Sequence, residues 1–117
     1  MLVIKVWCLP KAPEKRLFEL SKGFDRILAG FAKKLGFNKN RKCYLFPADM
    51  METGLGEEIL IEVSGLSQRP RTSKVLDDLQ VFATELAVEV TRFYPKARVV
   101  SRLEPYDPDQ VTWSNRS

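Results

Sequence analysis

The sequence repeats itself at a spacing of 57 residues, and this repeat constrains the fold more than any other feature. Residues 3–13 and 60–70 share four identities: Ile4 with Ile61, Val6 with Val63, Leu9 with Leu66 and Pro13 with Pro70. In each copy, a short segment rich in β-branched residues precedes a longer segment with helical periodicity. The sequence therefore predicts a duplicated β-α-β unit, in which each helix crosses over to bring two strands parallel.

Hydrophobic periodicity defines the elements expected in each half. In the first half it predicts a strand over residues 2–7, a helix over 14–35 that ends before Gly36, and a strand over 42–46. In the second half it predicts a strand over 58–63, a helix from Thr72 or Ser73 to before Pro95, and a strand over 96–103. We expect a loop at 48–56 and an irregular tail, or one short strand, over residues 105–117. The chain is thus expected to be one domain, 1–117, with halves 1–57 and 58–117.

The chain contains no histidine, which removes several kinds of chemistry. Ser-His-Asp and Cys-His catalysis and histidine-ligated zinc are excluded. Two cysteines, Cys8 and Cys43, are too few and too far apart for a zinc site, so we expect both to be reduced and buried, and we expect no metal site. Catalysis would have to use carboxylates, lysine, tyrosine, cysteine or the α-amine.

Charge is divided unevenly along the chain. Residues 1–48 carry a net charge of +8, and the remaining residues carry −4. A basic half is typical of a site for an anionic ligand or nucleic acid, but it also arises when lysines form the solvated face of an amphipathic helix. The start of the chain lacks the features of a signal peptide, and no apolar run approaches the ~20 residues of a membrane span. The sequence therefore predicts a cytoplasmic protein without a membrane segment.

The element order, the strand at the first residues and the ending Val111-Thr112-Trp113-Ser114-Asn115 resemble the tautomerase superfamily, which includes macrophage migration inhibitory factor. The first half, with the turn Gly54-Leu55-Gly56, also resembles the 4-oxalocrotonate tautomerase subunit. The resemblance implies an α/β (α+β) fold with a four-stranded sheet and two helices on one face. It also implies a homotrimer with sites at subunit boundaries, where a proton is transferred next to a carbonyl group without a metal or organic cofactor.

The same resemblance indicates the candidate site residues. Met1 lies where the family has its catalytic amino-terminal proline, and we expect Met1 to be retained because Leu2 is large. The primary α-amine of Met1 would then be the base. Two family arginines that hold substrate carboxylates correspond to Lys11 and Lys42. Arg102 lies near a family asparagine and either adds positive charge to the pocket or is an ordinary outward-facing strand residue.

Three functions are consistent with these residues. The first is a tautomerase-fold protein that binds a small carboxylate or keto acid and has weak or no keto–enol isomerase activity. The second is a homotrimeric binding module that has kept the fold and lost the chemistry. The third is a ferredoxin-like module that binds nucleic acid, which has the same element order. The strand over 58–63 disfavours this third function, because it contains two glutamates and no aromatic residue.

Overall fold

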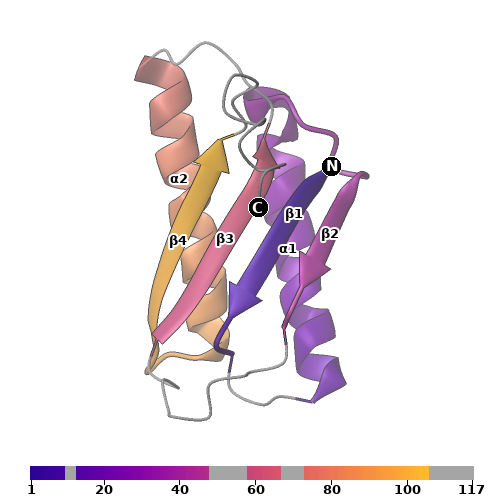
Figure 1. Ribbon diagram of the computed structural model, residues 1–117, viewed down its shortest axis with the longest axis vertical. Helices are drawn as coiled ribbons and strands as arrows, with labels where there is room; N and C mark the ends of the chain where they lie inside the picture. The colour runs from indigo at the N-terminus through magenta and orange to yellow at the C-terminus, as the bar shows by residue number, and fades with distance from the viewer. Residues whose placement is uncertain (10–12, 48–57, 67–72, 106–117) are drawn as a thin grey trace, which may run out of the picture.

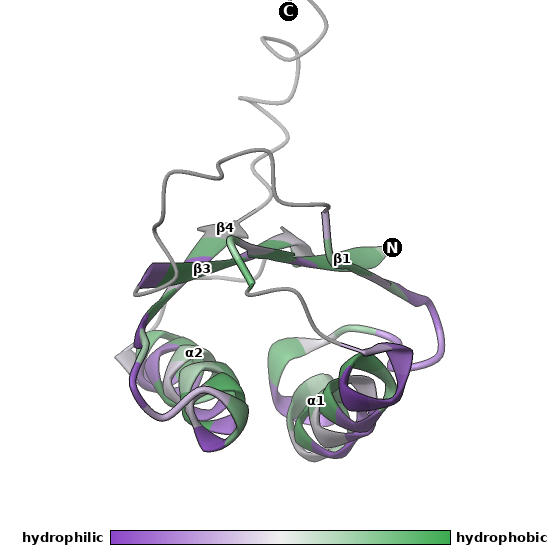
Figure 2. Cartoon of the chain, turned by 90° about the horizontal axis from the view of Figure 1, so that it is seen from below, coloured by the Kyte–Doolittle hydropathy of each residue, from purple (hydrophilic) through white to green (hydrophobic). Residues whose placement is uncertain are grey.

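The computed structural model describes residues 1–9, 13–47, 58–66 and 73–105. Its elements, in chain order, are β1 (Leu2–Trp7), α1 (Glu14–Leu35), β2 (Lys42–Leu45), β3 (Glu58–Leu66), α2 (Ser73–Phe93) and β4 (Arg98–Pro105). The strands form one four-stranded sheet, and both helices pack against the same face of it (Figures 1 and 2). The predicted fold class is confirmed. The expected loop at 48–56, the C-terminal tail and the Val111–Asn115 segment lie outside the described residues.

The strand order is β2-β1-β3-β4, and the pairing has the same register in both halves. Leu2 pairs with Lys42 and Ile59 pairs with Val99, so each partner lies 40 positions later, and both outer pairs are parallel. The central pair, β1 with β3, is antiparallel and sets Lys5 opposite Glu62. These two residues are equivalent positions of the 57-residue repeat. The sheet therefore has an approximate two-fold axis that passes between Lys5 and Glu62.

The structure corrects several predicted strand ends. β3 continues to Leu66 although we expected it to end at Val63, because Gly65 adopts a positive φ of 87° and forms an irregularity in the pairing with β4. A β-carbon at this position would overlap the carbonyl oxygen of Met1, so the strand passes a site that only glycine fills without strain. β4 begins at Arg98, later than expected, because Ala97 closes a turn by donating to the carbonyl of Tyr94.

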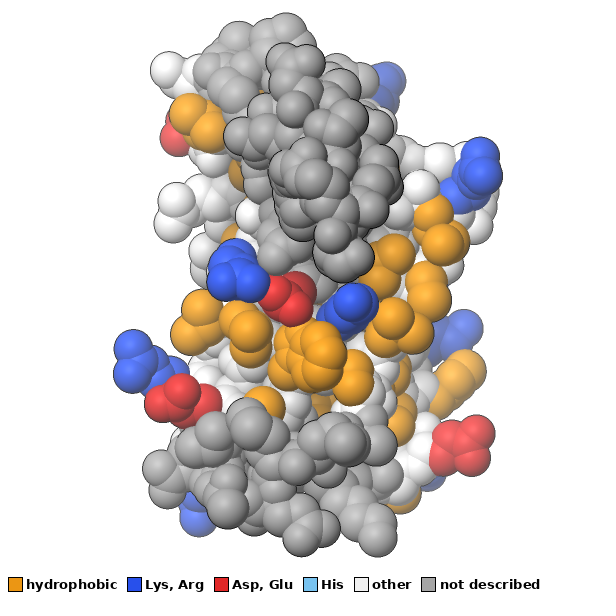
Figure 3. Space-filling view, viewed as in Figure 1, with side chains coloured by type: hydrophobic (Ala, Val, Ile, Leu, Met, Phe, Trp, Pro, Cys, Tyr) orange, Lys and Arg blue, Asp and Glu red, His pale blue; other side chains and the backbone are white. Residues whose placement is uncertain are grey.

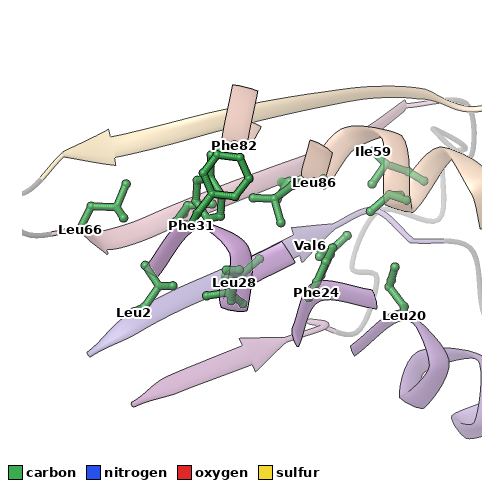
Figure 4. Packing of buried hydrophobic residues seen from close by; sticks show 14 of the residues in the cluster. Leu2, Val6, Leu20, Phe24, Leu28, Phe31, Ile59, Leu66, Phe82 and Leu86 are labelled. Carbon is green, nitrogen blue, oxygen red and sulfur yellow. The ribbon is translucent and has the colours of Figure 1, made fainter. Parts of the chain in front are cut away.

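The core lies between the sheet and the two helices. Alternate residues of β1 and β3 face the helices, and these residues are almost completely buried. Phe31 of α1 and Phe82 of α2 meet with their ring centroids 5.2 Å apart, which joins the two helices above the sheet (Figure 4). Cys8 and Cys43 are free, but both are only partly buried, so the prediction that they lie in the core was wrong.

The helices also meet at a polar contact. Glu89 of α2 is only 7% exposed, and its carboxylate lies against Gly23 of α1. Arg26 of α1 and Arg92 of α2 hold this carboxylate from its solvent side, at 3.7 Å and 3.0 Å. The absence of a side chain at Gly23 provides the space that the carboxylate occupies. The predicted bounds of α1 are confirmed, and Gly36 ends it in the left-handed conformation.

Candidate functional site

One face of the sheet is not covered by either helix (Figure 2). Because successive strand residues point to opposite faces, this uncovered face carries the strand residues that lie between the core residues in the sequence. Its apolar members are Val3, Trp7, Cys43, Leu45, Leu60 and Val100. Figure 3 shows apolar side chains gathered on this face around a small group of charged ones. Monomeric proteins rarely expose a contiguous apolar surface of this kind, so the face is a candidate interface.

Glu62 lies at the centre of the uncovered face and accepts two hydrogen bonds. The indole Nε1 of Trp7 donates to one carboxylate oxygen at 2.6 Å, and the guanidinium of Arg102 donates to the other at 2.5 Å. Burial alone raises the pKa of Glu62, but these hydrogen bonds and the charges of Arg102 and Lys5 outweigh burial and lower the pKa below its ordinary value. Glu62 is therefore an ionised acceptor at neutral pH and not a proton donor.

A second cluster joins β2 to α1 on the helix side of the sheet. Asp25 accepts a hydrogen bond from the Tyr44 hydroxyl at 2.7 Å, and the Lys42 ammonium lies 2.6 Å from the same carboxylate oxygen. Burial alone raises the pKa of Asp25, but the hydrogen bonds from Lys42 and Tyr44 lower it overall. Burial and the neighbouring carboxylate raise the pKa of Tyr44 far above its usual range. Tyr44 is thus a neutral hydrogen-bond donor, and Lys42 is held by a carboxylate of its own chain.

The three predicted site residues that the structure describes do not converge within one chain. Met1 is 72% exposed and precedes β1, next to the start of β2, where Leu2 pairs with Lys42. The Lys42 ammonium is on the helix side of the sheet, whereas Arg102 is on the uncovered face and is paired with Glu62. Lys11 lies outside the described residues. A pocket that uses these residues together would need a second copy of the chain.

Sequence reasoning did not identify the two carboxylates that hold these cations. A signal for Glu62 was present, because the repeat aligns it with Lys5 and so brings opposite charges to equivalent strand positions. No comparable signal exists for Asp25, which the helical period assigns only to the side of α1 that is not fully buried. Its pairing with Lys42 depends on how β2 lies over α1, which a local pattern does not specify.

Within residues 1–9, 13–47, 58–66 and 73–105, no three or more cysteine, aspartate or glutamate side chains gather closely enough to hold a metal ion. Neither of the two described helices is apolar over enough of its length to cross a membrane.

Comparisons with known proteins bear on the fold. No protein-family model and no curated protein matches the chain. The solved structures that are similar to this chain include the following three. Macrophage migration inhibitory factor of Toxoplasma gondii superposes with a TM-score of 0.61 at 15% identity, over 91% of this chain and 90% of that chain. A fused 4-oxalocrotonate tautomerase, described as an asymmetric trimer, gives 0.60 at 13% identity, over 88% and 86%. Malonate semialdehyde decarboxylase gives 0.56 at 16% identity, over 94% and 87%.

TM-scores of 0.56 to 0.61 over almost the whole length show that the chain shares the fold of these proteins. This fold is the one that the resemblance of the sequence implied.

Proposed function

We propose that the chain forms a homotrimer that binds a small carboxylate or keto acid at its subunit boundaries, with weak or no keto–enol isomerase activity. The main observation that supports this proposal is the uncovered apolar face of the sheet. A second and a third copy would bury this face, as closed symmetric assemblies commonly do. The similarity to a fused 4-oxalocrotonate tautomerase described as a trimer supports the number three.

Met1 is the proposed catalytic residue. Its α-amine would take a proton from one position of a keto–enol pair and return it at the other, so the reaction needs no cofactor and no co-reactant. The high exposure of Met1, 72% in a single chain, leaves the residue available to a boundary pocket. A primary amine lacks the fixed ring geometry of a proline, which supports a slow reaction.

Lys11, Lys42 and Arg102 are the proposed ligands of the substrate carboxylate. Lysine binds a carboxylate as a point charge, without the two parallel hydrogen bonds that arginine makes. Asp25 already holds Lys42 and Glu62 already holds Arg102, so a substrate carboxylate would compete with two carboxylates of the protein. This competition supports weak binding.

The test combines assembly with turnover. Native mass spectrometry is expected to give three subunits, and phenylpyruvate is expected to undergo slow enol–keto exchange that acetylation of the α-amine abolishes. Lys42→Ala and Arg102→Ala should each weaken binding of phenylpyruvate, whereas Lys39→Ala, an exposed lysine near β2, should not.

The other outcomes separate the alternatives. A trimer with neither turnover nor carboxylate binding would favour the non-catalytic module. A monomer that binds RNA in a salt-sensitive manner would overturn the proposal and favour the nucleic-acid module. The cytoplasmic location and the single domain over residues 1–117 stay predictions.

A further inference from the structure

A groove runs between α2 and β4 on the helix side of the sheet, away from the uncovered face. It has a volume of about 310 Å³, which lies at the lower end of the range of ~300–1,000 Å³ that small-molecule sites span. Small α2 side chains, including Ala83 and Ala87, leave the space open, and Val99 and Ser101 of β4 form the opposite wall. The groove is a surface separate from the candidate site.

The walls of this groove carry no charge. The described residues that line it are alanine, valine, threonine, serine and glutamine, so an ion in the groove would lose solvation without gaining a counter-charge. Two hydroxyl groups are already committed to the helix, because Thr84 donates to the carbonyl of Gln80 and Thr91 donates to the carbonyl of Ala87. These threonines therefore present mainly their methyl groups and oxygen lone pairs.

Ser101 is the exception among the polar groups of the groove. Its hydroxyl oxygen is buried and has no hydrogen-bond partner among the described residues. A buried hydroxyl without a partner destabilises the structure, so a molecule that supplies the missing hydrogen bond binds more tightly than one that does not.

We propose that the groove between α2 and β4 binds a neutral, mainly apolar molecule of one or two rings, whose single polar group hydrogen bonds to the Ser101 hydroxyl. Ala83, Ala87 and Val99 provide the apolar contacts, and the uncharged walls select against carboxylates. This ligand class is the opposite of the anionic one proposed for the subunit boundary. An experiment that contradicts one of the two proposals therefore leaves the other unaffected.

Three probes with one ring system test the ligand class. 2-Naphthol is neutral at pH 7 and has one hydroxyl, naphthalene lacks that hydroxyl, and 2-naphthoate carries a negative charge. In titrations followed by amide NMR shifts, 2-naphthol is expected to perturb α2 and β4 and to bind more tightly than naphthalene. 2-Naphthoate is expected to leave these elements unperturbed. Perturbation by 2-naphthol confined to the uncovered sheet face would overturn the proposal.

Three variants test the geometry. Ser101→Ala should lower the affinity for 2-naphthol about threefold to tenfold, the effect of one hydrogen bond, and leave the affinity for naphthalene unchanged. Ala87→Leu should fill the groove and abolish binding of both. Val81→Leu is the control, because Val81 is an exposed α2 residue outside the groove. Circular dichroism checks that each variant is folded. Unchanged 2-naphthol binding in folded Ser101→Ala or Ala87→Leu would contradict the proposal.

Discussion

Gly23 and Gly30 lie in the same helix but in opposite surroundings. A β-carbon at Gly23 would overlap the buried carboxylate of Glu89, whereas one at Gly30 would meet no atom within 4 Å apart from its chain neighbours and the backbone of its own helix. Gly23→Ala should therefore lower the free energy of unfolding by about 1–3 kcal/mol, because the carboxylate must move within a packed contact. Gly30→Ala should raise it by about 0.5–1 kcal/mol, because alanine favours the helix.

Urea unfolding of the two variants and the wild type measures both effects in one experiment. Each variant is the control for the other, since both make the same chemical change in α1. Equal effects of the two substitutions would contradict the helix contact described for Glu89.

Met1 offers a second test on the scale of one residue. A proline inserted between Met1 and Leu2 would occupy the position of Met1 once the initiator is removed, and would supply a secondary amine in a fixed ring. If the proposed boundary pocket exists, this insertion should raise the rate of phenylpyruvate enol–keto exchange about tenfold or more. An inserted alanine is the control, because it gives the same chain length with a primary amine. Equal rates for the two insertions would contradict a catalytic role for this position.

Charge partners were the least predictable residues. Trp7, Glu62 and Arg102 come from three different strands, and their contact exists only after the sheet has formed. The alternation within each strand separates the residues of its two faces, but it does not specify which polar groups meet on the uncovered face. Sequence therefore predicted the candidate cations without predicting the carboxylates that hold them.

Among the elements, α1 and β2 are joined by the contact of Asp25 with Lys42 and Tyr44. Because the folded protein lowers the pKa of Asp25 below its ordinary value of 3.8, the ionised carboxylate stabilises the fold above that pH. The stabilisation is lost as the pH falls through the lower, folded pKa. Asp25→Asn should be less stable than the wild type at pH 7, and the difference should shrink as the pH falls below about 4.

Urea unfolding between pH 7 and pH 3 measures this dependence. Glu19→Gln is the matched control, because it removes an exposed carboxylate from the same helix. A difference between Asp25→Asn and the wild type that stays constant over this range would show that the carboxylate does not act through its charge.

Element bounds were predictable where one local signal dominates. α1 begins after Pro13 and ends before Gly36, and both residues are visible in the sequence. β3 was predicted too short because glycine usually interrupts a strand, whereas Gly65 here allows the strand to continue past an irregularity. Whether the strand ends or continues at Gly65 depends on the neighbouring strand. The sequence of β3 alone therefore did not predict its end.

On the scale of the whole molecule, the uncovered sheet face should hold the assembly together. Val100 on this face and Val81 on α2 are the same residue type and are 48% and 49% exposed in the single chain. Val100→Glu should convert the proposed trimer to monomers, because it would place a charge in the proposed interface, and Val81→Glu should leave that trimer intact. Native mass spectrometry of the two variants at equal concentration gives the result. A trimer that survives Val100→Glu would exclude this face as the interface.

The fold was predictable because the repeat and the periodicity agree over most of the chain. The site was less predictable, since its proposed residues lie on different sides of one chain and would meet only across copies. A single sequence describes one chain, and it contains no local signal for a pocket that several chains would form.

The charges at the two-fold axis between Lys5 and Glu62 affect which halves pair with each other during folding. Each half has a strand that is able to pair with its equivalent in another molecule, because β1 and β3 occupy equivalent positions in an antiparallel ladder. Two first halves would set Lys5 against Lys5, and two second halves would set Glu62 against Glu62, whereas the native pairing sets a lysine against a glutamate. Like charges directly opposite one another destabilise a strand pair, and opposite charges stabilise it. One charge difference at the axis thus disfavours pairing between two first halves or two second halves of neighbouring molecules, and favours pairing of a first half with a second half.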